Sequence, residues 1–93
     1  MQAPFLPLDP NKATCVYHQL KIWPVYFQAV EDRTKTFDVR LDDGWNFRVG
    51  DALCLQEWNP ETRLYTGRVA VRMVRYIHRG MGLAPGYAIL GFA

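Results

Sequence analysis

The hexapeptide KTFDVR, from Lys35 to Arg40, combines side chains that could bind a ligand or take part in a reaction. Two cations, a carboxylate and a hydroxyl fall within these six residues. On a strand, Asp38 and Arg40 would share one face and could form a surface ion pair that contributes little to stability. Alternatively, Arg40 could bind a phosphate or a base edge, while Asp38 orients it or accepts a hydrogen bond from an amino group. Residue types alone favour the surface ion pair.

Other kinds of catalytic or cofactor site find little support in the residue types. No glycine-rich phosphate-binding motif is present, and the absence of serine excludes a Ser-His-Asp triad. His18 and His78 form no metal-binding pair, so we expect no metal and no cofactor. Cys15 and Cys54 lie in strand-like segments, where a free cysteine is more often a small buried hydrophobe than a nucleophile.

The three tryptophans could either belong to the core or offer flat surfaces on which a nucleobase stacks. Trp45 follows Gly44 in a polar turn, so we expect it to be the most exposed of the three. Trp58, at a strand end beside a turn, comes second, ahead of Trp23.

Charge is distributed unevenly along the chain, although the formal net charge is only +2. Residues 31–61 carry eight acidic and four basic residues, whereas residues 62–93 carry five arginines and no acidic residue. These arginines are Arg63, Arg68, Arg72, Arg75 and Arg79. They could present a positive face to phosphate, or acidic residues of the middle segment could neutralise them across neighbouring strands. The sequence leaves both arrangements open.

Length and composition describe one small globular domain. The chain has 93 residues, of which 49% are hydrophobic and 22% charged. No apolar run approaches the roughly 20 residues needed to cross a bilayer, and the N-terminus lacks the features of a secretory signal. Two cysteines are too few for a disulfide scaffold, so we expect a cytoplasmic protein with reduced thiols.

Hydrophobic periodicity predicts the elements that must position these residues. Prolines at positions 4, 7 and 10 predict an extended arm over residues 1–14, followed by a single domain over residues 15–93. Strands are predicted at residues 15–21, 35–41, 52–58, 68–78 and 86–92, and one short helix at residues 24–32. Pro24, after Trp23, suits the first helical position, and helical spacing puts Tyr26, Phe27 and Val30 on one side of the helix. Asn59-Pro60 is typical of a hairpin turn. Five strands, one early helix and short turns favour a small mixed-sheet barrel over a doubly wound fold.

The alternation of apolar and polar residues also predicts which side chains share a face. In the segment KTFDVRL, we expect Phe37, Val39 and Leu41 to face the core, opposite the polar face with Asp38 and Arg40. In the long strand near the C-terminus, the apolar positions change parity close to residues 73 and 74, which predicts a β-bulge.

Several motifs, in this order, resemble those of a known family. HQLKI at residues 18–22 precedes KTFDVR at 35–40, FRVGDALCL at 47–55, EWNPET at 57–62 and GYAIL at 86–90. Together they resemble the ASCH (activating signal cointegrator homology) domains of the PUA-like superfamily, in the short branch found in bacteria and phages. The resemblance covers about residues 16–92 and leaves out only the proline-rich arm.

The resemblance implies an α+β, mainly β fold: a PUA-like β-barrel with one short helix beside a cleft that binds RNA or a modified nucleoside. It assigns the cleft to Lys21, Lys35, Thr36, Asp38 and Arg40. We add Arg68, Arg72 and Arg75 as supporting phosphate contacts. For Asp38 and Arg40, the resemblance favours a binding cleft over a surface ion pair.

Two further functions stay open as alternatives to a binding module. One ASCH subgroup is an amidohydrolase that deacetylates N4-acetylcytidine, and there Lys35 would act as nucleophile or base. This sequence has Asp38 where those enzymes have a threonine, and no acidic residue follows Glu61, whereas the enzymes use a late glutamate. Glu57 could substitute only if the fold brought it across the cleft. The other alternative is a phage-type protein that binds and modulates a host protein.

Overall fold

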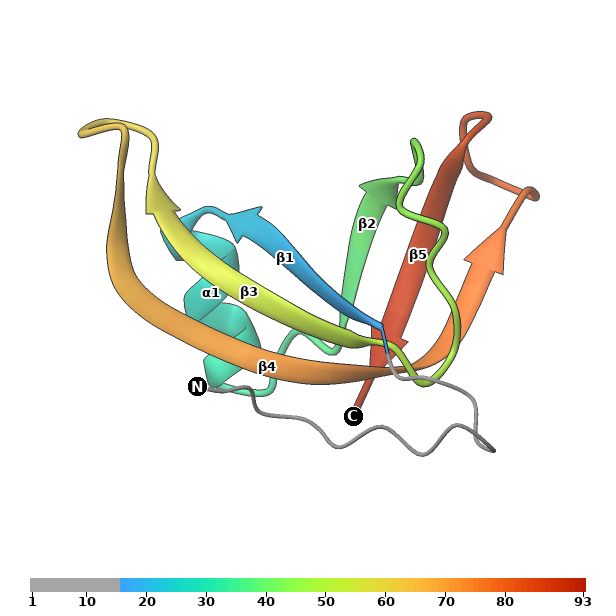
Figure 1. The fold of residues 1–93 in the computed structure, drawn as a ribbon, viewed down its shortest axis with the longest axis horizontal. Coiled ribbons are helices and arrows are strands. Elements are labelled where there is room, and N and C mark those ends of the chain that lie inside the picture. Colours follow the sequence, from blue (N-terminus) through green and yellow to red (C-terminus); the bar gives the residue numbers. More distant parts are fainter. Residues whose placement is uncertain (1–15) are drawn as a thin grey trace.

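The computed structural model describes residues 16–93, whose strands form one five-stranded sheet with a helix beside it (Figure 1). The elements are β1 (Tyr17–Ile22), α1 (Pro24–Glu31), β2 (Phe37–Leu41), β3 (Ala52–Asn59), β4 (Leu64–Arg79) and β5 (Tyr87–Phe92). The predicted class, α+β and mainly β with five strands and one early helix, is confirmed. The arm predicted for residues 1–14 lies outside the described residues.

The strand order is β1-β3-β4-β5-β2, which leaves β1 and β2 as the two edge strands. β1 pairs with β3 in parallel, and the other neighbours are antiparallel. The predicted mixed sheet is therefore confirmed. Within residues 16–93 no backbone pairing joins β1 to β2, so closure into a PUA-like barrel stays a prediction.

β4 is long enough to belong to both halves of the sheet. Its first part pairs with β3 and its last part with β5, and the strand curves between the two halves (Figure 1). The pairing with β5 shifts register between Val74 and Tyr76. Val74 is buried whereas Tyr76 is exposed, so the shift changes the parity of the inward-facing positions. The bulge predicted near residues 73 and 74 is confirmed.

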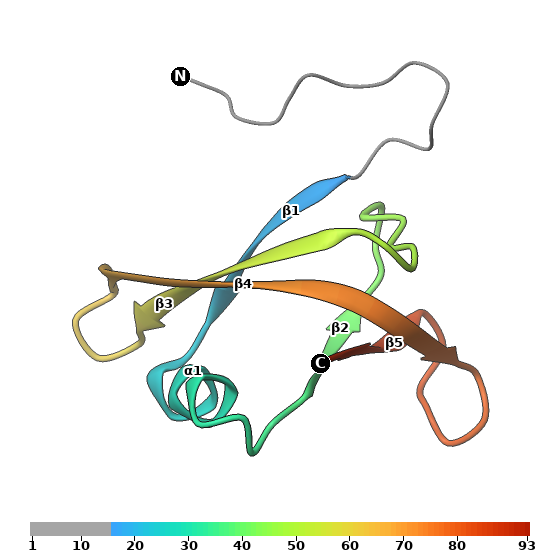
Figure 2. The ribbon, with the colours of Figure 1, turned by 90° about the horizontal axis from the view of Figure 1, so that it is seen from below.

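Helix α1 packs against β3 and β4 on one side of the sheet (Figure 2). It begins at Pro24, whose fixed φ suits the first helical position. Phe27 and Val30 are buried, but Tyr26, which the periodicity placed beside them, is exposed. A helix of eight residues is not stable in isolation, so its packing on the sheet maintains it. The core cluster comprises Leu20, Ile22, Phe27, Val30, Phe47, Leu53, Leu55, Ala70, Val74, Ala88, Leu90 and Phe92.

The facing predicted for β2 is wrong, although its alternation is right. Asp38 is buried, whereas the outward-facing Phe37, Val39 and Leu41 are each 43–46% exposed. The register with β5 explains the inversion, because Asp38 is paired with Leu90 and Arg40 with Ala88, both fully buried. Residues paired across two strands lie on the same face of the sheet. Asp38 and Arg40 therefore lie on the core side of β2.

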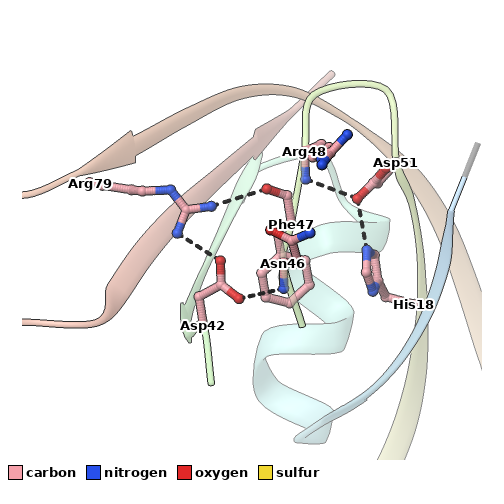
Figure 3. A network of polar contacts seen from close by, with 7 residues as sticks. All are labelled: His18, Asp42, Asn46, Phe47, Arg48, Asp51 and Arg79. Carbon is pink, nitrogen blue, oxygen red and sulfur yellow. Dashed lines mark hydrogen bonds and ion pairs between the residues drawn. The ribbon is translucent and has the colours of Figure 1, made fainter. Parts of the chain in front are cut away.

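The connection from β2 to β3 is held by Asp42 (Figure 3). Its carboxylate accepts hydrogen bonds from the Asn46 backbone N–H and from Nη1 of Arg79, both at 2.7 Å. Nη2 of Arg79 also donates to the Phe47 carbonyl at 3.0 Å. Burial favours the neutral form of Asp42, but the hydrogen bonds and the positive charge of Arg79 outweigh it and lower the pKa of Asp42 below its usual 3.8.

His18 belongs to the same network and is a structural residue (Figure 3). Its Nε2 lies 2.8 Å from Oδ2 of Asp51, and both side chains are almost completely buried. The same oxygen accepts the Arg48 backbone N–H at 2.9 Å, and the His18 ring meets Phe47 edge-on at 4.7 Å between centroids. These contacts hold the end of the β2–β3 connection against β1.

Candidate functional site

A pocket of about 320 Å³ lies where the end of β1, the start of α1 and β2 meet. Its volume is at the lower end of the range of about 300–1,000 Å³ that is usual for small-molecule sites. The lining residues are Lys21, Ile22, Trp23, Tyr26, Asp38, Val39 and Arg40. Three of the residues predicted for the cleft, Lys21, Asp38 and Arg40, are therefore brought together from the two edge strands of the sheet.

Two exposed aromatic rings, those of Trp23 and Tyr26, line this pocket. Trp23 has an extended backbone and immediately precedes the helix, and its carbonyl accepts the Tyr26 N–H at 3.1 Å. The spacing of three residues places both side chains on the same side of the first helical turn. Trp23 is 49% exposed and Tyr26 51%. Rings this accessible can stack on a planar ligand.

The guanidinium of Arg40 connects the two edge strands across the open side of the sheet. Nε donates to Oδ2 of Asp38 and Nη2 donates to the backbone carbonyl of Lys21, each at 2.6 Å. The side chains of Arg40 and Asp38 are 23% and 11% exposed. Such a partly buried, charge-assisted pair is stronger than an ion pair on the open surface.

The Asp38–Arg40 pair keeps hydrogen-bonding capacity for a ligand. A guanidinium has five N–H bonds. The hydrogen bonds to Asp38 and Lys21 use the one on Nε and one of the two on Nη2, which leaves the others for a ligand. Asp38 uses Oδ2 for Arg40, and among residues 16–93 no side-chain hydrogen bond is formed by Oδ1. Donors and an acceptor therefore stand side by side in the wall of the pocket.

Two lysines add positive charge at and beside the pocket. Lys21 lines it, and its Nζ lies 4.1 Å from the ring centroid of Trp58. Lys35 stands next to it, with Nζ 5.6 Å from the ring of Tyr26 and 4.2 Å from that of Phe37. Both ammonium groups lie over aromatic rings and, among the described residues, neither forms an ion pair with a carboxylate.

The remaining predicted residues lie elsewhere. Thr36 and Arg75 line a separate cavity that also includes Phe37 and Gly91. Arg68 and Arg72 lie beside helix α1 and pair with acidic residues of the middle segment of the chain. Nη1 of Arg68 is 3.6 Å from Glu57, and Nη2 of Arg72 is 3.2 Å from Glu31 at the end of the helix. Arg79 pairs with Asp42 in the same way, so neutralisation from the middle segment is confirmed for these three arginines.

Glu57 does not take the place of a late glutamate in the pocket. It is buried, its Oε1 accepts a hydrogen bond from Thr66 Oγ1 at 2.6 Å, and Arg68 approaches its Oε2. It lines a different cavity, of about 310 Å³, which it shares with Arg68 and Tyr65. The carboxylate in the candidate site is that of Asp38.

Sequence reasoning underestimated the aromatic side of the site. Trp45 was expected to be the most exposed tryptophan, but it is 42% exposed and stacks on Phe47, and Trp23 is the more exposed of the two. Tyr26 was expected to face the core. The helix start at Pro24 was recognisable from the sequence. Trp23 and Tyr26 are three residues apart at this helix start, and this spacing was the signal that both rings lie on the same side of the helix.

Neither a metal centre nor a membrane-crossing helix is found in residues 16–93. No three His, Cys, Asp or Glu side chains there are grouped so as to hold a metal ion. α1 is too short to cross a membrane. Cys54 is buried, as expected for a cysteine in a strand, and Cys15 lies outside the described residues.

Comparison with known proteins matches the chain to a protein family. The model of a family described as a domain of unknown function, DUF3850, matches residues 17–92. No curated protein matches the chain significantly. The matched range includes every strand, the helix and all residues that line the pocket.

Proposed function

We propose that this chain, a member of the DUF3850 family, binds a nucleobase of RNA or of a modified nucleoside in the pocket between β1, α1 and β2. The observation that carries the proposal is the position of the Asp38–Arg40 pair beside the exposed rings of Trp23 and Tyr26. A nucleobase has a flat face that stacks on aromatic rings and an edge that carries donors and acceptors together. The pocket offers a partner for each.

The size and charge of the pocket support the same ligand class. A volume of about 320 Å³ suits one nucleoside better than a large cofactor. Lys21 lines the pocket and Lys35 stands beside it, so a phosphate attached to the bound nucleoside would meet positive charge. The resemblance to ASCH domains points to the same residues, Lys21, Lys35, Asp38 and Arg40, for a cleft that binds RNA or modified nucleosides.

The two exposed aromatic side chains give the cleanest test of the proposal. Titrations of Trp23→Ala and Tyr26→Ala with nucleosides and short RNAs should show about a tenfold loss of affinity each, because stacking on one aromatic side chain is worth about 1–3 kcal/mol per base. Both side chains are about half exposed, so neither truncation opens a core cavity.

A matched control variant lies on the same helix. Val25 is 66% exposed and does not line the pocket, so Val25→Ala should bind as the wild type does. The proposal would be refuted if Trp23→Ala and Tyr26→Ala bound nucleosides and RNA with wild-type affinity. It would also be refuted if the wild-type chain bound none of these ligands.

A further inference from the structure

A second aromatic surface lies on the outer face of β2, β5 and the last part of β4. Phe37 on β2 and Tyr76 on β4 are 43% and 67% exposed. They flank Gly91 of β5, which is the paired residue of both. A cavity of about 480 Å³ lies at this point and is also lined by Thr36 and Arg75. We call these five residues the outer platform.

Gly91 creates the hollow between the two rings. The backbone does not require glycine here, because Gly91 does not have a positive φ. A Cβ at this position would lie 3.4 Å from the Tyr76 carbonyl oxygen and 3.6 Å from its Cβ, which is ordinary van der Waals contact. The strand could therefore carry a side chain at this position, but that side chain would fill the space between Phe37 and Tyr76.

The charge of the outer platform suits an anionic partner. None of the residues that line its cavity is acidic. Arg75 is exposed and, unlike Arg68, Arg72 and Arg79, forms no ion pair with a carboxylate of residues 16–93. Lys35 adds a second cation, with Nζ 4.2 Å from the ring of Phe37. Exposed aromatic rings flanked by unneutralised cations are typical of surfaces that bind single-stranded nucleic acid.

The outer platform and the pocket meet at the edge of the sheet. Asp38 and Arg40 line the pocket from one face of β2, and Phe37 belongs to the platform on the other face. Lys35 lies between them, because its Nζ is over the Phe37 ring and 5.6 Å from the ring of Tyr26 in the pocket. A strand of nucleic acid that passes around this edge would place a phosphate at Lys35.

We infer that the ligand is a single strand of RNA several nucleotides long, with one base in the pocket and a neighbouring base over Gly91 between Phe37 and Tyr76. Arg75 and Lys35 contact the phosphates that join these nucleotides. The inference rests on the proposed function, since it extends the ligand from the pocket onto the outer platform. It assigns the ligand class as a polynucleotide rather than a free nucleoside.

The test compares a single nucleoside with an RNA of eight nucleotides, both titrated against the same variants. Tyr76→Ala should weaken binding of the octanucleotide about tenfold and change nucleoside binding less than twofold, because only the longer ligand reaches the platform. Gly91→Ala should weaken octanucleotide binding without unfolding the chain, since the added methyl group fits the backbone. Tyr65→Ala is the control, because Tyr65 is a similarly exposed tyrosine (55%) on the opposite end of β4.

Salt dependence tests the phosphate contact separately. Arg75→Ala should reduce the slope of log affinity against log salt by about 0.7, as expected for the loss of one contact to a single strand. Arg63→Ala is the matched control, because it makes the same change in net charge at an exposed turn between β3 and β4. Equal slopes for the two variants would contradict the contact at Arg75.

Failure of the platform and failure of the pocket give different results. If Tyr76→Ala and Gly91→Ala bind the octanucleotide normally while Trp23→Ala weakens both ligands, the outer platform is refuted and the pocket stands. If Tyr76→Ala weakens octanucleotide binding but Trp23→Ala has no effect on either ligand, the pocket is refuted, and with it the continuous path. If the wild-type chain binds no RNA but self-associates through Tyr76 in sedimentation experiments, the outer face is a protein interface and the inference is wrong.

Discussion

Replacing Arg40 with alanine should destabilise the fold by much more than the loss of a surface ion pair. The change removes two hydrogen bonds of 2.6 Å and leaves the Asp38 carboxylate, 11% exposed, without its cation. Hydrogen bonds to charged groups contribute about 1.5–3 kcal/mol, and breaking a fully buried ion pair costs about 3–5 kcal/mol. Arg40 is 23% exposed, so the expected loss lies between the surface and buried limits, at about 2–3 kcal/mol.

Asp38→Ala should destabilise the fold less than Arg40→Ala, because the Arg40 side chain has more access to water than the Asp38 side chain. After Asp38→Ala, Arg40 keeps its bond to the Lys21 carbonyl and can turn its free N–H groups to solvent, so we expect a loss of about 1 kcal/mol. Arg40→Lys keeps the charge, but one ammonium cannot replace the planar fork that reaches both Asp38 and Lys21, and its loss should be intermediate. Arg48→Ala is the control, since Arg48 is exposed and only its backbone bonds to Asp51.

Urea and thermal unfolding, followed by tryptophan fluorescence, measure these differences. For a domain of this size, 2–3 kcal/mol corresponds to a fall in Tm of roughly 10–20 °C. Arg40 links β1 and β2 by bonding both the Lys21 carbonyl and the buried Asp38 carboxylate. Two results would refute this role: a loss below about 1 kcal/mol for Arg40→Ala, or a larger loss for Asp38→Ala than for Arg40→Ala. RNA binding by the Arg40 variants is informative only at temperatures where they remain folded.

Two further predictions concern Asp42 and catalysis. The pKa of Asp42 is lowered in the folded chain, so its ionised carboxylate stabilises the fold at pH values above its usual pKa of 3.8. This contribution is lost as the pH falls further. The difference in unfolding free energy between wild type and Asp42→Asn should therefore be present at pH 7 and vanish in acid. A difference independent of pH would contradict this. For N4-acetylcytidine we expect no release of cytidine by chromatography, because Asp38 is bonded to Arg40 and Glu57 lines another cavity. Turnover that disappears in Lys35→Ala would contradict that expectation.

Local patterns in the sequence were sufficient to predict most of the architecture. Trp23-Pro24 predicted the helix start, Asn59-Pro60 the turn after β3, and the change of apolar parity predicted the bulge at Val74. These features depend on the backbone preferences of a few consecutive residues, which act wherever the segment lies. The grouping of Lys21, Asp38 and Arg40 was implied by the family resemblance, and these three residues line one pocket.

Which face of β2 meets the core was decided only by the tertiary structure. Alternation in β2 separates Phe37 and Val39 from Asp38 and Arg40 equally well in either orientation, and the register with β5 selects the orientation by pairing Asp38 with the buried Leu90. For the same reason, the sequence could not show which arginines of β4 form ion pairs with carboxylates and which do not. Glu31 and Asp42, which pair with Arg72 and Arg79, are 41 and 37 residues away along the chain. Among the described residues, Arg75 forms no ion pair with a carboxylate. Pairing across strands depends on which segments become neighbours, and periodicity within one strand carries no information about its neighbours.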